Sequence, residues 1–405
     1  MKGGVQEPVH ELRSRPRGIG GYIKQSASSR PVLIAAWAAL LFLPFKGIMP
    51  ALTLFIIIVA GLPALQLARK PWSAGFRTAA LKSLPRFPLR VFAESRFGRS
   101  SALPLLFIIL LVLPFTLRDY YMDVLVMSGI YVLLALGLNV IVGFTGLLNL
   151  GFAAFYAIGA YTYALLNTKL GLGFWPSLPL SAGAAALSGL LLAFPALRLK
   201  GDYLAIVTLG FGEILRIVLN NWDSFTNGPN GISGITPPFL FGVSLGSLKY
   251  YYYLVLLIVL VAVPVMKRVE ASRIGRAWLA IKENEIAASS MGINTTRYKL
   301  YAFAFGTFWA GIAGILFAAK MRFVSPESFT FMESVLILSM VILGGLGNIY
   351  GAAAGAVILV VLPEALREVQ SYRMLILGIG LVLLMIFRPQ GLLSRNKILK
   401  SRKQN

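Results

Sequence analysis

Long runs of apolar residues, separated by short polar segments, set the pattern of this chain. Several runs reach about 17 to 22 residues, the length that an α-helix needs to cross a hydrocarbon core roughly 30 Å thick. We expect spans near residues 32–44, 49–68, 103–117, 124–142, 148–166, 177–197, 204–220, 250–266, 298–319, 331–346, 350–365 and 373–388. The pattern therefore predicts an all-α polytopic membrane protein with about 10–12 transmembrane helices.

Composition and the placement of charge agree with this prediction. Only 13% of the 405 residues are charged, about half the share of a soluble domain. With twelve spans and the N-terminus inside, 29 of the 38 lysines and arginines fall in the inside segments. This asymmetry predicts that both termini are cytosolic. The net charge of +23 does not indicate nucleic acid, because the basic residues cluster in loops and tails.

Several chemistries are not supported by the residues. The chain has no cysteine, and its single histidine, His10, lies in a polar basic tail, so we expect no metal site. The only dipeptide resembling the end of a phosphate-binding loop is Lys82-Ser83, which lacks the preceding glycines. No nucleophile and base are arranged for catalysis. We therefore expect no enzyme activity and no ATP hydrolysis by this chain.

The apolar and basic segments divide the chain into four parts. We expect a basic cytosolic tail at 1–31, a hydrophobic hairpin with a basic cytosolic loop at 32–100, a core at 101–390 and a second basic cytosolic tail at 391–405. The largest outside loop, 221–249, contains "NGPNGISGITPP". Glycine, proline and asparagine form turns, which predicts a folded extracytoplasmic loop.

The inside loop 268–296 contains "GRAWLAIKENEIAASSMGIN", a polar segment between apolar runs. A helix drawn through 276–291 places Trp278, Ile281 and Ala288 near one side, with Lys282, Glu283 and Glu285 toward others. Such a helix either lies on the membrane or docks into a groove on a partner. Its acidic middle and its small-residue end favour docking, because small residues allow another protein surface to approach closely.

Two glycine-rich junctions look alike. They are "LGLNVIVGFTGLLNLG" (136–151) and "LSMVILGGLGNIYGAAAGA" (338–356), and each follows an apolar span and contains asparagine. Transporters often consist of repeated halves with broken helices near the binding site. A possible internal repeat follows from this similarity.

Glu213 and Arg216 lie within the expected span 204–220. Ionisable residues inside a membrane usually face the protein interior and are functional candidates. Two interpretations stay open: the pair lines a path for zwitterionic amino acids, or it serves local structure and assembly. Further candidates for a passage, with packing as the alternative role, are Asn139, Asn149, Tyr156, Tyr161 and Thr208.

One short stretch of the inside loop matches the residue spacing of a known motif. "IAASSMG" (286–292) resembles the coupling loop of ATP-binding cassette (ABC) importer permeases, whose pattern is Glu-Ala-Ala, three residues, then Gly. Ala287, Ala288 and Gly292 fall in register. Ile286 stands where the pattern has Glu, and Glu285 lies one residue earlier.

Longer blocks carry the resemblance through about 101–395. They are "GLNVIVGFTGLLNLGFAAFYAIGAYTYALL" (137–166), "LRLKGDYLAIVTLGFGEILRIVLNN" (197–221), "NGPNGISGI" (227–235), "IGRAWLAIKENEIAASSMGIN" (274–294), "SPESFTFMESVLILSMVILGGLGNIYGAAAGA" (325–356) and "LPEALREVQSYRMLILGIGLVLLMIFRPQGLL" (362–393). Together they resemble the LivM-type permease subunits of the branched-chain amino acid ABC importer family. Asn149 stands where the pattern usually has Asp.

The resemblance implies an ABC importer permease fold in a bacterial inner membrane. It implies a second homologous permease, two ABC ATPases that carry ATP and Mg, and an extracytoplasmic binding protein that delivers branched-chain amino acids. This chain would hold no cofactor. The implied ATPase-coupling residues are Gly275, Arg276, Glu283, Glu285, Ala287, Ala288 and Gly292. The implied binding-protein platform is Gly228, Pro229, Asn230 and Gly231. The translocation path would use Glu213, Arg216, Asn139, Asn149, Tyr156 and Thr208.

Two other functions compete with this prediction. A related ABC permease for urea or short amides would share the same features. A secondary transporter working without ATP would usually carry more ionisable residues within its spans, and it would not need the amphipathic segment.

Overall fold

The computed structural model describes residues 118–197, 201–240 and 243–365, with a few further positions (111, 113–115, 199, 378, 382, 391 and 392). All of these belong to one unit, Ala102–Asn405. The expected spans 32–44 and 49–68, the tail 1–31 and the loop 69–100 lie outside the described residues, as do most of the spans 103–117 and 373–388 and of the tail 391–405.

The described part consists almost entirely of helices joined by short loops. Its long helices are α7 (Asp119–Leu138), α8 (Phe152–Leu170), α9 (Phe174–Ala196), α10 (Asp202–Asn221), α12 (Leu248–Ala271), α15 (Thr295–Met321), α16 (Phe331–Gly344) and α17 (Ile349–Ala365). Shorter helical elements are η1 (Asn139–Phe144), α11 (Asp223–Thr226), η2 (Gly228–Asn230), α13 (Arg273–Glu283), α14 (Glu285–Ser290) and η3 (Pro326–Phe329). The strands are β1 (Ile232–Ser233), β2 (Phe239–Leu240), β3 (Val243–Ser244) and β4 (Phe323–Val324).

Helix α15 is the central element, and it packs against α7, α8 and α9. It is 27 residues long, and 83% of its most apolar window is buried. Small residues let its neighbours approach closely: a Cβ added at Gly159 of α8 would lie 2.5 Å from the Gly311 carbonyl oxygen of α15. Close backbone approach of this kind is typical of helix packing in membranes, where small residues line the contacts.

The helix lengths fit a membrane protein. Within the described residues, four helical segments are long and apolar enough to cross a bilayer: Asp119–Phe144, Phe174–Ala196, Thr295–Met321 and Pro326–Gly344. Helices α8, α10 and α12 have comparable lengths of 19, 20 and 24 residues. The expected span boundaries are mostly close to these. Helix α8 begins at Phe152 rather than at residue 148, because residues 146–151 leave the helical conformation, with Gly146 at φ +73°.

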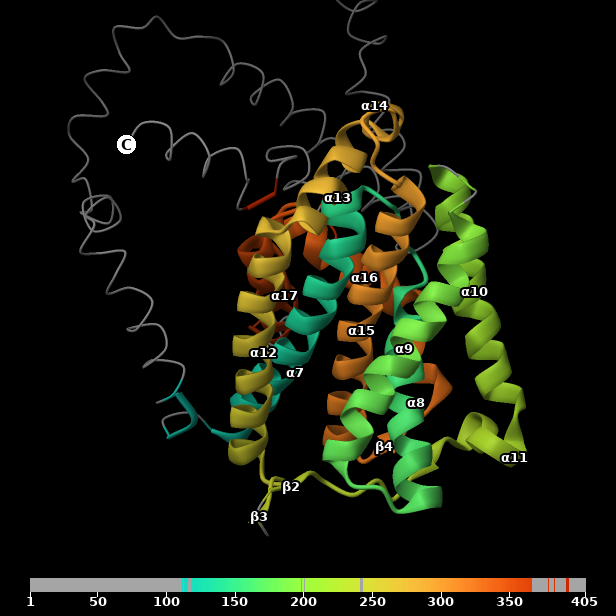
Figure 1. Cartoon of the computed structure of the whole chain (residues 1–405). Helices are drawn as coiled ribbons and strands as arrows, with labels where there is room; N and C mark the ends of the chain where they lie inside the picture. The colour runs from blue at the N-terminus through green and yellow to red at the C-terminus, as the bar shows by residue number, and fades with distance from the viewer. Residues whose placement is uncertain are drawn as a thin grey trace, which may run out of the picture. The chain divides into compact units, whose positions relative to one another are not determined.

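Two ends of the described unit differ in structure, as Figure 1 shows. Helices α13 and α14 lie at one end, called here the α13 end, where α12 ends and α15 begins. The opposite end, called the α11 end, carries α11 and the hairpin of β2 and β3. Strand β1 pairs with β4, so that the loop after α10 is joined to the segment after α15. The loops 268–296 and 221–249 therefore lie at opposite ends, as predicted.

Candidate functional site

Helix α10 buries few of its residues within the part of the chain that the structure describes. Its buried residues are Leu204, Ala205, Thr208 and Leu219. Large apolar side chains point outward along one side: Tyr203, Ile206, Ile214 and Ile217 are each more than half exposed. A Cβ at Gly210, between them, would meet no atom within 4 Å. We call this side, residues 203, 206, 210, 214 and 217, the open face of α10.

A charged network lies beside this open face. The Arg216 Nε donates to the Glu213 Oε2 over 3.1 Å, one helical turn away. Arg216 also lies 3.6 Å from the Glu327 carboxylate of η3. The Glu213 and Arg216 side chains are 32% and 30% exposed. The pair therefore compensates its own charge and still reaches the surface of the unit, in the middle of a membrane-length helix.

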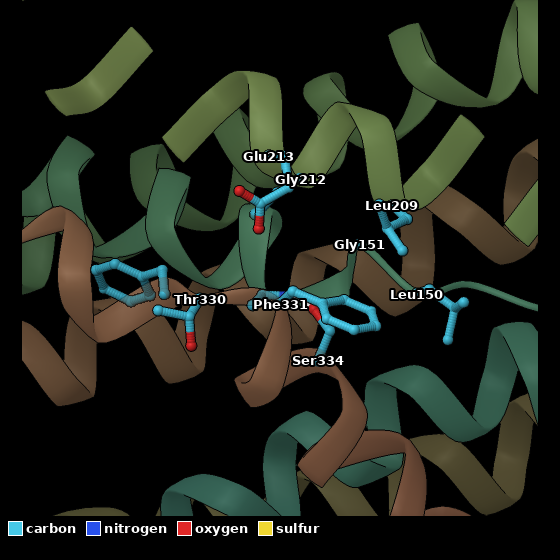
Figure 2. A pocket seen from close by; sticks show the side chains of 11 residues that line it. Leu150, Gly151, Leu209, Gly212, Glu213, Thr330, Phe331 and Ser334 are labelled. Carbon is cyan, nitrogen blue, oxygen red and sulfur yellow. Dashed lines mark hydrogen bonds between the residues drawn. The ribbon is translucent and has the colours of Figure 1, made fainter. Parts of the chain in front are cut away.

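A narrow pocket with a cavity volume of about 10 Å³ lies beside Glu213 (Figure 2). It is lined by Leu150, Gly151, Ala153, Ala154, Leu209, Gly212, Glu213, Phe329, Thr330, Phe331 and Ser334. The Glu213 side chain extends from α10 toward the turn that carries Thr330 and Phe331. We call this the Glu213 pocket.

The Glu213 pocket forms where two helices begin. The first turns of α8 and of α16 both line it. They are joined there by a hydrogen bond from the Ala153 backbone N–H to the Ser334 Oγ, 2.9 Å long. The first turn of a helix leaves backbone N–H groups without intrahelical partners and carries a partial positive charge. The pocket thus combines a carboxylate with two positive helix ends.

Helix α10 is attached to this pocket through its buried side. The Thr208 Oγ1 accepts a hydrogen bond from the Leu150 backbone N–H over 3.0 Å. A Cβ at Gly151 would clash with the Thr208 carbonyl, so only glycine allows α10 to lie this close to the start of α8. Thr208 is one of the predicted path candidates, and the structure places it in this contact.

The other path candidates lie inside the packing of the unit. Asn139, Asn149, Tyr156 and Tyr161 are all buried. Tyr156 packs against Phe317 and Phe329. The Asn149 Oδ1 accepts from the Gly151 N–H. Glu213 and Arg216 are therefore the two candidates that reach the surface.

The segment at the α13 end is two helices, where the sequence predicted one through 276–291. Asn284 interrupts it with extended backbone, and its side chain accepts a hydrogen bond from the Ala287 N–H that begins α14. Asparagine is among the residues preferred at this capping position, which explains the break. The predicted apolar side is confirmed, since Trp278, Ile281 and Ala288 are buried.

The seven residues proposed for ATPase coupling are distributed over both helices and the turn that follows. Arg276, Glu283, Ala287 and Gly292 are exposed, whereas Gly275 and Ala288 are buried. Glu285 is half-buried and pairs with the nearly buried Lys299 of α15. This ion pair ties α14 to α15, a partner that the sequence did not indicate. Two large apolar side chains, Ile286 and Met291, are more than 70% exposed here.

Lys282 joins helix α13 to the C-terminal end of the helical segment formed by α7 and η1. Its Nζ donates to the Gly143 carbonyl oxygen over 2.7 Å. On the same helix, Trp278 stacks on Phe144, with ring centroids 6.4 Å apart. Gly143 and Phe144 belong to η1, a π-helical turn that ends α7. The sequence pattern placed Lys282 on the polar side of this helix but did not indicate its role, because a lysine in a polar helix is ordinary, and Gly143 lies 139 positions away.

The two glycine-rich junctions that look alike in sequence touch each other at this place. The Asn139 Oδ1 accepts a hydrogen bond from the Gly347 backbone N–H over 2.9 Å. A Cβ at Gly143 would come within 2.6 Å of the Gly347 nitrogen. We call residues 139–147 and 344–348 together the glycine junction. The possible internal repeat stays a prediction.

The four residues proposed as a binding-protein platform form a tight turn at the α11 end. Gly228, Pro229 and Asn230 make the 3₁₀ turn η2, and Gly231 follows it. Pro229 and Asn230 are exposed, whereas the two glycines are buried. The loop is held to the bundle by Thr236, whose backbone N–H donates to the Asn167 Oδ1 of α8. The predicted folded loop is therefore present, with its turn facing outward.

Comparisons with known proteins complete the description of the site. The family model described as "Branched-chain amino acid transport system / permease component" matches residues 120–385. The chain is 48% identical, over 76% of its length and 78% of the relative's, to the "High-affinity branched-chain amino acid transport system permease protein LivM" of Salmonella typhimurium. It is 46% identical to the protein of the same description from Escherichia coli, over 81% and 82%.

A second kind of relative is more distant. The "High-affinity branched-chain amino acid transport system permease protein LivH" of Salmonella typhimurium is 26% identical over 68% of this chain and 94% of the relative. No solved structure matches the chain.

Proposed function

This chain belongs to the family of branched-chain amino acid transport system permease components, and from that premise we propose how it works with its partners. The predicted family and the polytopic helical class are confirmed. The chain is a multi-pass membrane protein and a transport component, not an enzyme. We propose that it is one permease subunit of an ATP-driven importer in a bacterial inner membrane, with both termini cytosolic, and that it passes branched-chain, neutral amino acids into the cytosol.

The observation that carries this proposal is the partly exposed ion pair Glu213–Arg216 on α10. Inserting a charged residue at the bilayer centre costs about 2.5–3.5 kcal/mol of free energy on insertion scales. This pair is therefore unlike a surface that faces lipid. A zwitterionic amino acid presents one ammonium and one carboxylate. Glu213 offers a partner for the ammonium, and Arg216, with the positive helix ends at the Glu213 pocket, suits the carboxylate. The translocation path would thus run along this side of α10.

A second homologous permease would close the path from the other side. The open face of α10 is apolar and carries Gly210, which leaves room for another helix. The similarity to both LivM and LivH descriptions supports a pair of related permeases. A polar group on the partner would complete the network of Glu213, Arg216 and Glu327. The second subunit would therefore cover this face, while selectivity would reside in the binding protein.

The ATPases would bind at the α13 end. Ile286 and Met291 are exposed there among polar residues, which fits insertion into an apolar groove on a partner. Ala287 and Gly292 are exposed and small, so they would allow close approach, and Glu283 is exposed as well. The binding protein would sit at the α11 end, on the turn of Pro229 and Asn230. This chain would hold no cofactor, because ATP and Mg belong to the ATPase subunits.

The test is reconstitution after gentle purification. The tagged chain is purified from its native membrane in mild detergent, and the proteins that accompany it are identified by mass spectrometry. We expect a second permease and two ATPases. The complex is then placed in proteoliposomes with the binding protein, and uptake of labelled leucine, isoleucine and valine is followed with and without ATP.

Uptake of these amino acids that requires ATP and the binding protein is the expected outcome. If urea or a short amide were taken up and fully inhibited leucine uptake, the substrate class would be urea or short amides instead of branched-chain amino acids. Uptake by the chain alone without ATP would refute the importer and restore the secondary transporter.

A further inference from the structure

The glycine junction lies between two parts of the molecule with different roles. On one side it touches α13, through Lys282 and Trp278. On the other side, both segments that leave it lead to the Glu213 pocket. Residues 145–151 run from η1 to the start of α8, and α16 runs from Phe331 at the pocket to Gly344 at the junction. The two routes meet again at the pocket, in the bond from Ala153 to Ser334.

The contact between Lys282 and Gly143 has a clear physical basis. Helix α7 and η1 form one helical segment, Asp119–Phe144, whose last carbonyl groups have no partner within the helix. The Ile141 carbonyl is satisfied by the Thr145 hydroxyl and the Leu147 N–H. The Gly143 carbonyl accepts from Lys282 instead. A cation at a helix C-terminus is favourable because the helix dipole is negative there.

The geometry on both sides of this bond resists small displacements. Gly143 cannot carry a side chain, because Asn139 and the Gly347 backbone fill the space. Gly347 is held by the Asn139 side chain. The Phe144 ring stacks on Trp278, whose Nε1 donates to the Tyr298 carbonyl at the start of α15. These contacts join α13 directly to both glycine-rich segments.

We propose that Lys282 is the positioning residue through which α13 controls the Glu213 pocket. When α13 is displaced by its partner, Lys282 moves the C-terminal end of the α7–η1 segment, and residues 145–151 and α16 carry the displacement to the first turns of α8 and α16. The proposal rests on the proposed function, because it assumes that an ATPase displaces α13. It adds the route inside this subunit and the residue that begins it.

The first test removes the bond and keeps the side-chain length. Lys282→Met loses the ammonium, and Lys282→Arg retains a cationic donor. Lys267→Met is the matched control, because Lys267 lies at the same end and contacts the Tyr350 ring instead of the junction. Each variant is assembled with the second permease and the ATPases in proteoliposomes with binding protein, and amino acids imported per ATP hydrolysed are measured.

For Lys282→Met we expect ATP hydrolysis within about twofold of the unaltered complex and at least tenfold fewer amino acids imported per ATP. Lys282→Arg should restore the ratio to within threefold, and Lys267→Met should not change it. An unchanged ratio in Lys282→Met would overturn the proposal. If the unaltered complex itself showed no ATP-dependent import, the proposed function would fail. If the unaltered complex imported amino acids and every variant had the same number of amino acids imported per ATP, only the proposal about Lys282 would fail.

A second test replaces the bond with a covalent link. The chain has no cysteine, and a Cβ at Gly146 would lie 3.8 Å from the Lys282 Cβ, a separation suited to a disulfide. The positive φ of Gly146 (+73°) strains any side chain there, so the same double variant is compared with itself in its oxidised and reduced states. In the double variant Gly146→Cys and Lys282→Cys, import per ATP should be within threefold of normal when oxidised and at least tenfold lower after reduction in the same vesicles. Equal ratios in the two states, or a higher ratio after reduction, would refute transmission through this contact.

Discussion

Helices α15 and α10, 27 and 20 residues long, differ in how far the rest of the subunit buries them. The apolar window of α15 is 83% buried, and glycines bring its backbone against its neighbours on several sides. Helix α10 buries four residues and leaves an apolar face, with a charge pair beside it, uncovered. A helix buried on every side holds the bundle together, whereas one with an open face and compensated charges is suited to contact a partner and a polar substrate. The helix that the subunit itself buries therefore stabilises the fold, and the helix that it leaves partly exposed is the candidate for transport.

The largest effect is expected at the packing of α15. In Gly159→Leu, the new side chain would meet the Gly311 backbone, which cannot rotate away as a side chain can. Overpacking typically costs about 1–3 kcal/mol, occasionally more, and we expect the upper end or beyond. The free energy of unfolding, measured by SDS titration in mixed micelles, checks this.

Gly183→Leu on α9 is the control for that variant, because a Cβ there meets nothing within 4 Å. It should unfold at the same SDS fraction as the unaltered chain. Equal stability of both variants would show that the α8–α15 contact is not tight.

The next effect concerns the buried side of α10. Thr208→Val leaves the Leu150 N–H without its acceptor, and an unsatisfied buried donor costs about 1–3 kcal/mol. The same SDS titration should show a loss in this range. Thr168→Val on α8 removes an exposed hydroxyl that bonds only within its own helix, and it should lose less than about 0.5 kcal/mol. Equal losses would mean that Thr208 does not anchor α10.

The charge pair should affect transport more than stability. Glu213→Gln removes the carboxylate proposed to bind the substrate ammonium, and a hydrogen bond to a charged group is worth about 1.5–3 kcal/mol. We expect at least tenfold slower ATP-dependent uptake, with a smaller loss in the SDS titration because the Glu213 and Arg216 side chains are 32% and 30% exposed. Glu327→Gln, whose carboxylate is 3.6 Å from Arg216 and mostly exposed, should slow uptake less. A complex that forms poorly with Glu213→Gln would instead assign the pair to assembly.

The smallest effect is expected on the open face of α10. Ile214→Ala reduces the apolar area offered to the second permease, and truncation of most interface residues costs under about 1 kcal/mol. Recovery of the second permease on the tagged chain, measured over a dilution series, should fall about twofold to fourfold. Leu191→Ala, on the exposed surface of α9, should not change it. Equal recovery for both variants would place the partner elsewhere.

Much of the candidate site could be predicted from the sequence where the signal is local. Glu213 and Arg216 stand out because ionisable residues are rare in apolar runs, and their spacing allows a pair within one helix. Trp278, Ile281 and Ala288 follow from helical periodicity. The break at Asn284 has a local signal too, because asparagine three residues before the Ala287 N–H caps a new helix.

Other parts depend on residues far apart in the chain. The role of Lys282 depends on its hydrogen bond to the Gly143 carbonyl, and the role of Glu285 depends on its ion pair with Lys299. Glu327 joins Arg216 across the gap between η3 and α10. Each of these contacts requires the packing of several helices, and no pattern along one segment indicates it.

The sequence by itself determined the class of this protein, its helices and its family. Hydropathy and length are properties of single segments, and a segment in lipid must satisfy its own backbone hydrogen bonds, which only a helix does without other chains. The tertiary structure alone decided which helix keeps an open face, that two helix starts meet at Glu213, and that the two glycine-rich junctions touch beneath α13. These features arise from contacts between distant residues, where glycine permits backbones to approach and a single side chain such as Lys282 completes the end of another helix.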